Sequence, residues 1–459
     1  MREILLDAIV GIARFFGVDR AVGYGVLARV WGLFAGLLTM FIVAARFSKE
    51  QQGFYFTFSS LLTLQIFFEL GLMYVVATFV SHEFAGLQWG EQGGIVGETA
   101  AKGRIIDLLA KTTKWFAFAS FLLIVGLIPA GLLFLGWEQN TPREFAWRLP
   151  WVLAVVATAL SLLITPFFAM IMGSGDVVAV NRRELIGLII GTCFSWIVIE
   201  FNGGLYAVSA VLAGNILSAW TYLLREKPIL LRLVWDSIFH SARRGGRQET
   251  VSWGNEIWPM QWKIALSWVS GYFIFQLFNP ILFHYYGPAV AGQMGMTLSA
   301  ANALVAVSLT LMIAKSPEFG KLIALREWGR LDQLFGRIAV QSGFIAVLGG
   351  CAGWGAIWLL QAQHPIGQRF LPHQQAAVLF ASFCIQVVIQ GYAIYLRAHK
   401  KEPFLISTVV ISLLQGASTW YLGKRYSSEG ITTGFLMISL FVSLPISYVI
   451  WSRCKKAWH

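Results

Sequence analysis

The sequence predicts an all-α integral membrane protein with about twelve transmembrane helices in two six-helix halves. Hydrophobic residues make up 57% of the 459 residues and charged residues 13%, about half the charged fraction of a soluble domain. Twelve apolar segments are each about 20 residues long, the length that crosses a bilayer as a helix. The polar stretches between them are too short for a separate soluble domain, so we expect one membrane domain.

The expected spans follow one another with short connections. They cover residues 22–44, 54–80, 115–136, 149–172, 185–200, 204–224, 257–283, 289–314, 336–360, 373–396, 403–421 and 430–451. Residues 1–20 carry Glu3, Asp7 and Arg14 near one face, which predicts an interfacial amphipathic helix rather than a signal peptide. The four cysteines have no metal-type spacing and are expected to be reduced packing residues.

The distribution of Lys and Arg between the loops orients the chain. With the N-terminus in the cytoplasm, the outer loops hold only Arg46, Lys49, Arg143, Arg148, Arg369, Lys424 and Arg425. All other loop Lys and Arg residues are then cytoplasmic, so the positive-inside rule predicts both termini inside. The net charge of +12 is therefore explained by topology, and we expect membrane lipids rather than nucleic acid as partners.

Two cytoplasmic loops resemble each other and indicate an internal duplication. Residues 103–111 (GRIIDLLAK) and 329–337 (GRLDQLFGR) share the form G-R-x-x-x-L-x-x-basic. Each half has an even number of spans, so both halves enter the membrane from the same side and form parallel repeats. Transporters with such halves place the substrate site between them. We therefore expect halves at 21–224 and 257–452, a basic cytoplasmic linker at 225–256 and a cytoplasmic tail at 453–459.

Only three formal charges lie well inside the expected spans: Arg29, Glu69 and Lys263. Such charges are costly in hydrocarbon and usually face a cavity or a partner. Arg29 and Lys263 occupy counterpart spans, both roughly 10 Å inside the cytoplasmic edge. They predict a cationic cavity that binds a phosphate. The alternatives are snorkelling to the interface and, for Arg29, a structural pair with Glu69.

The polar and aromatic residues near these charges are further candidates. Glu69 is either a coupling site for a proton or cation or the clamp of Arg29. Gln65 and Asn302 lie at similar depth and would bond sugar hydroxyls or tie helices together. Trp258 and Trp262 share a face at the start of the seventh span, where they would stack on sugar rings or anchor the helix in the aromatic belt.

Several motifs carry a family resemblance. The segment 46–55 (RFSKEQQGFY) resembles the R-x-L-G-x-x-x-F-G-x-Y outer turn of Wzx-type polysaccharide flippases. Residues 68–72 (FELGL) are similar to their F-D-L-G-L, and residues 286–292 with 316–319 resemble their G-x-x-x-V-G … P-x-F pattern. The sequence departs from the pattern at Phe47, Gln52 and Glu69, where the family has Leu, Phe and Asp. The wider group is the multidrug/oligosaccharidyl-lipid/polysaccharide (MOP) exporter superfamily.

The resemblance implies a flippase without enzymatic activity or cofactor. It would move an undecaprenyl-pyrophosphate-linked oligosaccharide to the outer leaflet of the bacterial cytoplasmic (inner) membrane. A polysaccharide polymerase and glycosyltransferases would be its partners. The alternatives are a multidrug or cation exporter or a lipid II flippase of the same superfamily, and a membrane polysaccharide polymerase as the enzyme alternative. The outer loops are short and no phosphate-binding G-x-x-x-x-G-K-[ST] motif is present, which disfavours catalysis and ATP use.

Overall fold

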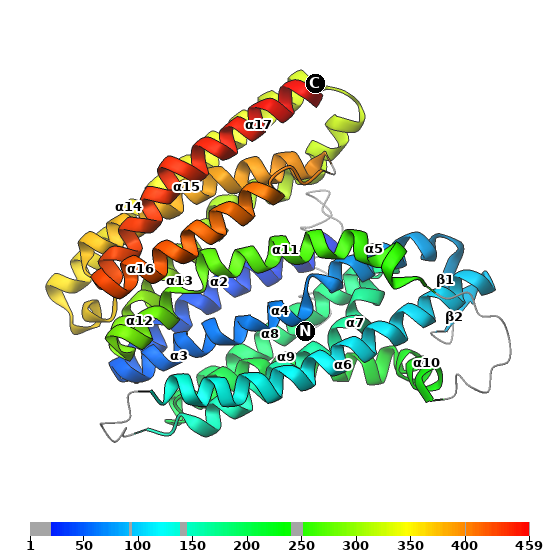
Figure 1. Cartoon of the computed structure of the whole chain (residues 1–459), viewed down its shortest axis with the longest axis horizontal. Coiled ribbons are helices and arrows are strands. Elements are labelled where there is room, and N and C mark those ends of the chain that lie inside the picture. Colours follow the sequence, from blue (N-terminus) through cyan, green and yellow to red (C-terminus); the bar gives the residue numbers. More distant parts are fainter. Residues whose placement is uncertain (1–19, 91–93, 138–144, 240–250, 400, 459) are drawn as a thin grey trace, which may run out of the picture. The chain divides into compact units, whose positions relative to one another are not determined.

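The computed structural model describes residues 20–90, 94–137, 145–239, 251–399 and 401–458, and nearly all of them are helical (Figure 1). An all-α membrane fold was predicted and is confirmed. The structure adds a short antiparallel hairpin of β1 (Leu87–Trp89) and β2 (Ile95–Gly97), whose three-residue strands are too short to give a sequence pattern. The amphipathic helix predicted over residues 1–20 lies outside the described residues, except for Arg20, where α2 begins. The middle of the predicted linker, residues 240–250, also lies outside them.

Eight of the described helices are long and apolar enough to cross a membrane, and ten if two bent helix pairs each form one span. One of the eight, Leu405–Trp458, has 54 residues, which is far longer than a bilayer requires. Its backbone leaves the helical region at Tyr426 and Ser427, inside the expected outer loop. The protein is thus a multi-pass membrane protein, and the count of twelve spans stays a prediction.

The chain forms two compact units. Unit 1 contains Met1–Ala35 and Leu64–Ala265, and unit 2 contains Gly36–Thr63 and Leu266–His459. The first, second and seventh expected spans therefore each run from one unit into the other.

Unit 1 holds the first part of α2 (Arg20–Arg46) and most helices of the first half. Besides α2 it contains α4 (Ile66–Glu69), α5 (Leu72–Glu83), α6 (Thr99–Leu135), α7 (Arg148–Gly173), α8 (Val177–Glu200), α9 (Tyr206–Glu226), α10 (Pro228–Phe239) and the start of α11 (Trp258–Phe275). A Cβ on Gly214 would lie 2.3 Å from the Cα of Gly191, so α8 and α9 approach at backbone distance. Close packing through glycine is a common way for helices to associate in membranes.

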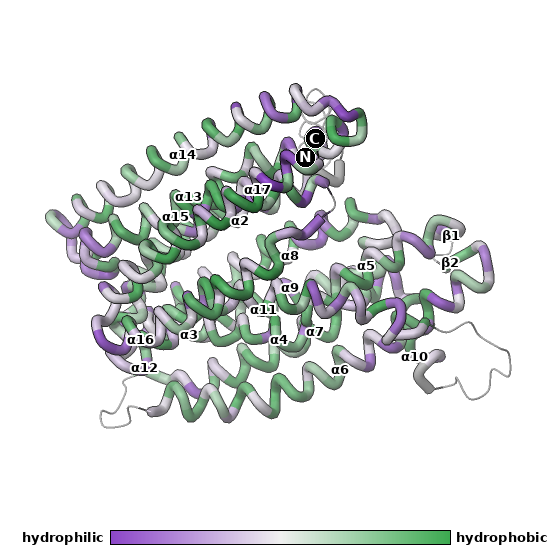
Figure 2. Tube along the Cα trace, turned by 45° about the horizontal axis from the view of Figure 1, so that its top comes forward, coloured by the Kyte–Doolittle hydropathy of each residue, from purple (hydrophilic) through white to green (hydrophobic). Residues whose placement is uncertain are grey.

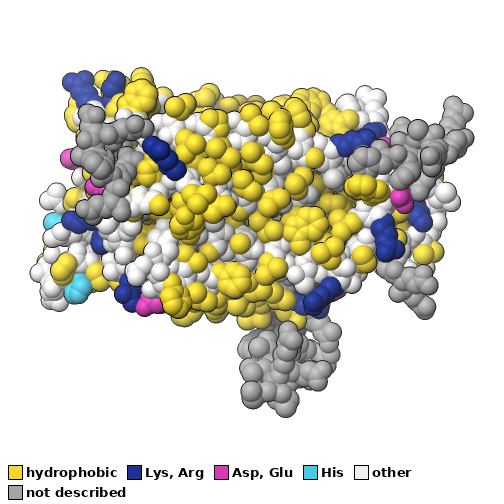
Figure 3. Space-filling view, turned by 90° about the horizontal axis from the view of Figure 1, so that it is seen from below, with side chains coloured by type: hydrophobic (Ala, Val, Ile, Leu, Met, Phe, Trp, Pro, Cys, Tyr) yellow, Lys and Arg dark blue, Asp and Glu magenta, His cyan; other side chains and the backbone are white. Residues whose placement is uncertain are grey.

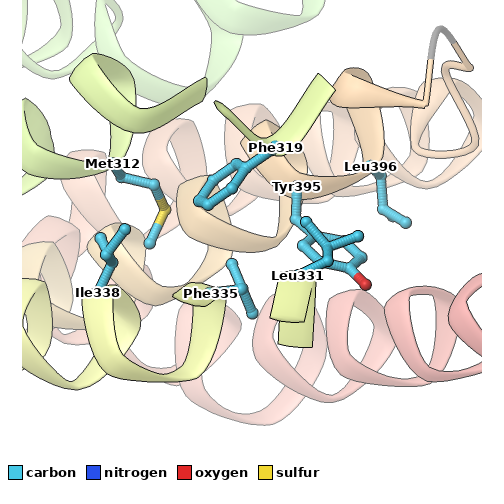
Figure 4. Packing of buried hydrophobic residues seen from close by; sticks show 7 residues of the cluster. All are labelled: Met312, Phe319, Leu331, Phe335, Ile338, Tyr395 and Leu396. Atoms are coloured by element: carbon cyan, nitrogen blue, oxygen red, sulfur yellow. The ribbon is translucent and has the colours of Figure 1, made fainter. Parts of the chain in front are cut away.

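Unit 2 contains α3 (Lys49–Leu62) and the helices of the second half. These are α12 (Phe278–Tyr286), α13 (Pro288–Ala324), α14 (Trp328–Gln363), α15 (His373–Ala398), α16 (Leu405–Ile438) and α17 (Leu444–Trp458). Ser48 begins α3 with a capping box in which its side chain and that of Gln51 satisfy each other's backbone N–H groups. Phe319, Phe335 and Tyr395 are among the buried residues where α13, α14 and α15 meet (Figure 4).

Hydrophobic residues occupy the middles of the helices, and hydrophilic residues gather at helix ends and connections (Figure 2). Many large apolar side chains are exposed, such as Phe121, Phe344 and Leu413. On the face drawn in Figure 3 hydrophobic side chains predominate, and Lys and Arg side chains are few. Large exposed apolar surface indicates a lipid environment in a protein of this composition.

Candidate functional site

The second expected span is broken next to Glu69. The 3₁₀ turn η1 (Thr63–Gln65) and the short helix α4 end at Glu69, and Leu70 and Gly71 then adopt left-handed backbone angles with φ of 50° and 64°. The helix resumes as α5, and the two parts are bent by 42°. A left-handed conformation is costly for a residue with a Cβ, so Leu70 is a strained position. Transporters place broken helices of this kind at binding sites.

Neighbouring helices support this break on two sides. The indole N–H of Trp115 on α6 donates to the carbonyl oxygen of Phe68 over 3.3 Å, which satisfies a backbone group that the interrupted helix leaves open. On the other side α11 comes close, because a Cβ on Gly71 would lie 2.3 Å from Cγ2 of Ile264. The break therefore lies against the part of α11 that carries Lys263.

Lys263 is exposed and forms no salt bridge with any described residue. Its ammonium group lies 5.8 Å from the centre of the Trp262 ring, a distance at which a weak cation–π attraction operates. Trp258 and Trp262 are 52% and 41% exposed, so both indoles are available to a ligand or to lipid. Lys263, Trp258 and Trp262 thus lie together at the start of α11, and their role as a binding group stays a prediction.

Arg29 lies on the inner part of α2 and is exposed, also without a salt bridge to a described residue. Its helix is held against α8, where Trp31 donates to the hydroxyl of Thr192 over 3.1 Å. Glu69 is half-buried, and no ion pair joins it to Arg29 or Lys263 in the described structure. The clamp considered between Arg29 and Glu69 is not formed in this structure.

The predicted site residues fall mostly into unit 1. Arg29, Gln65, Glu69, Trp258, Trp262 and Lys263 all belong to it, whereas Asn302 belongs to unit 2. Gln65 is half-buried within η1, and Asn302 is exposed on α13. The structure thus brings the break and the start of α11 together in unit 1, and Asn302 lies in the other unit.

One ion-pair cluster at the start of α6 was not predicted. The guanidinium of Arg104 bonds both Glu83, at the end of α5, and Glu256, just before α11. Beside it Lys111 bonds Asp107 and the carbonyl oxygen of Val251, each over 2.8 Å. The signal available in the sequence was the repeated G-R motif, but only the first copy makes this cluster.

The corresponding arginine of the second copy behaves differently. Among the described residues Arg330 forms an ion pair only with Glu327, over 2.8 Å and three residues earlier in the chain, and it is largely exposed. The duplication therefore gives two similar loops with different contacts. Among the described contacts, the loop of the first half is bonded to the segment that precedes the seventh span, at Val251 and Glu256. Arg330, in the loop of the second half, is bonded to nearby Glu327 instead.

Hydrogen bonds shift the pKa values of the Arg104 cluster, which lies outside the expected spans 115–136 and 257–283. The backbone N–H of Ser252 and the guanidinium of Arg104 lower the pKa of Glu256 below its usual value. The bond to Glu256 in turn raises the pKa of Arg104. A lowered carboxyl pKa stabilises the folded state above the usual carboxyl pKa, and that stabilisation is lost as pH falls through the lowered value.

Three solved structures share this arrangement of helices. An inward-facing multidrug resistance MATE family transporter of the MOP superfamily matches with a TM-score of 0.61 and 12% identity, over 94% of this chain and 96% of that chain. A mutant of the Vibrio cholerae MATE transporter VcmN matches with a TM-score of 0.56 and 13% identity, over 95% and 96%. The lipid II flippase MurJ, in an inward closed conformation, matches with a TM-score of 0.55 and 13% identity, over 97% and 87%.

In sequence, no protein-family model and no curated protein matches the chain. The structural matches extend over nearly the whole chain, so the fold is that of the MATE and MurJ membrane transporters. All three neighbours are transporters or flippases.

Proposed function

We propose that the protein is a flippase of the MOP superfamily that moves an undecaprenyl-pyrophosphate-linked oligosaccharide across the bacterial cytoplasmic membrane. The observation that carries the proposal is the pair Arg29 and Lys263. Both cations lie in apolar spans, both are exposed, and neither forms a salt bridge with a described residue. A cation in a span without an acidic partner is suited to an anionic ligand.

The chemistry of the two side chains fits a lipid pyrophosphate. The guanidinium of Arg29 offers a planar fork of donors to phosphate oxygens, and Lys263 adds a compact charge. Trp258 and Trp262, one turn apart beside Lys263, offer rings on which sugars stack. Gln65 and Asn302 are proposed to bond sugar hydroxyls.

The membrane potential favours export of such a substrate. Each charge that crosses a potential of 100 mV changes the free energy by about 2.3 kcal/mol. The cell interior is negative, so outward movement of an anionic headgroup runs downhill. Glu69 at the helix break is the proposed site at which a proton or cation gradient adds to this force.

The function is tested in the host that carries the gene. We expect Arg29→Ala and Lys263→Ala to reduce surface glycan and to leave its lipid-linked precursor in the inner leaflet, at unchanged protein abundance. Arg29→Lys and Lys263→Arg keep the charge and should restore part of the export. Lys456→Ala, on the exposed end of α17, is the control and should have no effect. Normal export in both alanine variants would refute the phosphate site.

The second candidate is a multidrug or cation exporter, which is favoured by Glu69, half-buried and without an ion pair to any described residue. A lipid II flippase fits the same two cations with a different glycan. In a drug exporter Glu69→Gln would abolish resistance to cationic drugs, whereas the Lys263→Ala variant would keep it. A polysaccharide polymerase and glycosyltransferases are the proposed partners of the glycan flippase, since they supply and consume its substrate.

A further inference from the structure

The turn between the first two spans is packed tightly against the start of the second half. A Cβ on Gly53 of α3 would lie 1.9 Å from the carbonyl oxygen of Pro288, and one on Gly292 would lie 2.9 Å from the backbone nitrogen of Gly53. Glycine at both positions lets α3 and α13 meet at backbone distance. All of these residues belong to unit 2, and the topology predicted from the sequence places them on the outer side.

Polar groups reinforce this packing. Gln52 is only 1% exposed, and its side-chain N–H₂ donates to the carbonyl oxygens of Gly292 over 2.8 Å and of Arg369 over 3.0 Å. The guanidinium of Arg369 donates in return to the carbonyl oxygen of Phe47. Three segments that are far apart in sequence are thus joined through Gln52 and Arg369.

One more side-chain hydrogen bond, at the surface, joins these segments. We call the whole set of contacts the outer contact (Phe47–Gly53, Pro288–Gly292 and Gln368–Arg369). The ammonium of Lys49 donates to the side-chain oxygen of Gln368 over 2.9 Å. Each of these hydrogen bonds between the segments involves at least one side chain. None of them is part of a backbone ladder like that of a β-sheet. Water can replace such bonds one by one when the segments separate.

We propose that the outer contact is the outer gate of the transport path, closed in this structure, and that Gln52 and Arg369 fasten it. This inference rests on the proposed transport function. A carrier that alternates access must break any contact that joins its two repeats on the side about to open. The outer contact joins the first pair of spans to the second half on the outer side, so it must break in the outward-open state.

The gate is tested by thiol labelling from outside. Thr57 of α3 is fully buried behind the outer contact, so Thr57→Cys is placed in a chain whose four native cysteines are replaced by alanine. A membrane-impermeant maleimide is added to intact cells. We expect slow labelling in this parent, and labelling about tenfold faster after Gln52→Ala, because two hydrogen bonds that favour the closed gate are lost.

The neighbouring glutamine provides a matched control. The side-chain oxygen of Gln51 accepts from the backbone N–H of Ser48, and the backbone N–H of Gln51 donates to the Ser48 hydroxyl, both within the helix cap. Neither bond crosses the outer contact, so Gln51→Ala should leave the labelling rate at the parent value. Equal labelling rates for Gln51→Ala and Gln52→Ala would overturn the gate. Labelling of Thr57→Cys as fast as that of a freely exposed cysteine in the parent would overturn it as well.

A cross-link separates failure of the gate from failure of the function. Lys49→Cys with Gln368→Cys, joined by a short bifunctional thiol reagent, should stop surface glycan export, and each single cysteine should not. If Gln52→Ala speeds labelling, and export continues both in the cross-linked protein and in the Arg29→Ala/Lys263→Ala double variant, the gate stands and the proposed glycan function falls. If export continues in the cross-linked protein but is lost in the double variant, the gate falls and the function stands. If the labelling rate does not respond to Gln52→Ala, the gate falls whatever the export assay shows.

Discussion

The charged residues of unit 1 differ chiefly in their partners. Arg104 has two carboxylates, Glu83 and Glu256, within bonding distance. Arg29 and Lys263 have no salt bridge to a described residue. A paired cation stabilises the fold, whereas an unpaired one in an apolar helix reduces stability unless a ligand provides the opposite charge. We therefore assign Arg104 to structure, and binding remains the proposed role of the other two.

Replacing Arg104 should lower stability. Arg104→Ala leaves two carboxylates without their cation, and we expect a loss of about 1–2 kcal/mol, more than for an isolated surface pair because one guanidinium serves both partners. Thermal unfolding of the purified protein in detergent measures the effect. The difference in unfolding temperature between Arg104→Ala and wild type should become smaller as pH falls and Glu256 takes up a proton. The lowered pKa of Glu256 is part of the stabilisation that Arg104 provides.

Lys315 is the matched control for Arg104. It forms one exposed ion pair with Glu318, three residues further along the helix, and such pairs contribute only about 0.3–0.5 kcal/mol. Lys315→Ala should leave the unfolding temperature nearly unchanged. Equal losses in the two variants would show that the Arg104 cluster does not hold α5 and the start of α11 to α6.

At the scale of the helices, the break in the second span is the most specific feature. A 3₁₀ turn, two left-handed residues and a bend of 42° occur within the stretch Thr63–Leu72. Mid-helix 3₁₀ turns often mark hinges. The chain also passes from unit 2 to unit 1 between Thr63 and Leu64, so the boundary between the units and the irregular backbone nearly coincide.

Gly71→Ala should destabilise the break. The positive φ costs a residue with a Cβ about 1–2 kcal/mol, and the new methyl group would also collide with Ile264. In an Ile264→Ala background the collision is removed. The loss of stability caused by Gly71→Ala should then fall to the part that comes from the positive φ. Thermal unfolding of the four proteins of this cycle measures both parts.

Gly126 of α6 is the control glycine, because nothing lies within 4 Å of a Cβ built there. Gly126→Ala should be neutral or slightly stabilising, as expected for a helical glycine in open space. A Gly71→Ala protein as stable as the Gly126→Ala protein would contradict the left-handed conformation at Gly71.

The sequence predicted the all-α fold because apolar runs of bilayer length are a strong signal. It also singled out Glu69 and Lys263 as charges in spans, but not the break between Glu69 and Leu72. Leu70 is an ordinary helix former, so its left-handed angle arises from tertiary packing. The Arg104 cluster was missed for a related reason: Glu256 is 152 residues away in the chain, and no local pattern predicts such a pairing.

At the scale of the whole molecule, the fold of MATE and MurJ transporters extends over nearly the entire chain. Three of the expected spans connect the two compact units, and most predicted site residues lie on the parts of those spans that belong to unit 1. This arrangement would suit the proposed carrier, because a change in the connecting spans would act directly on the candidate binding residues. The proposed function therefore requires that Arg29 and Lys263 meet an anionic lipid headgroup during transport.

The most direct test uses purified protein in liposomes with a fluorescent undecaprenyl-pyrophosphate-linked oligosaccharide. The measured quantity is the rate at which this lipid moves between leaflets, under an imposed potential of either sign. We expect flipping by the wild type, faster when the side of entry is negative, and a loss of at least about tenfold in the Arg29→Ala/Lys263→Ala double variant. Flipping at the wild-type rate in the double variant would contradict the account.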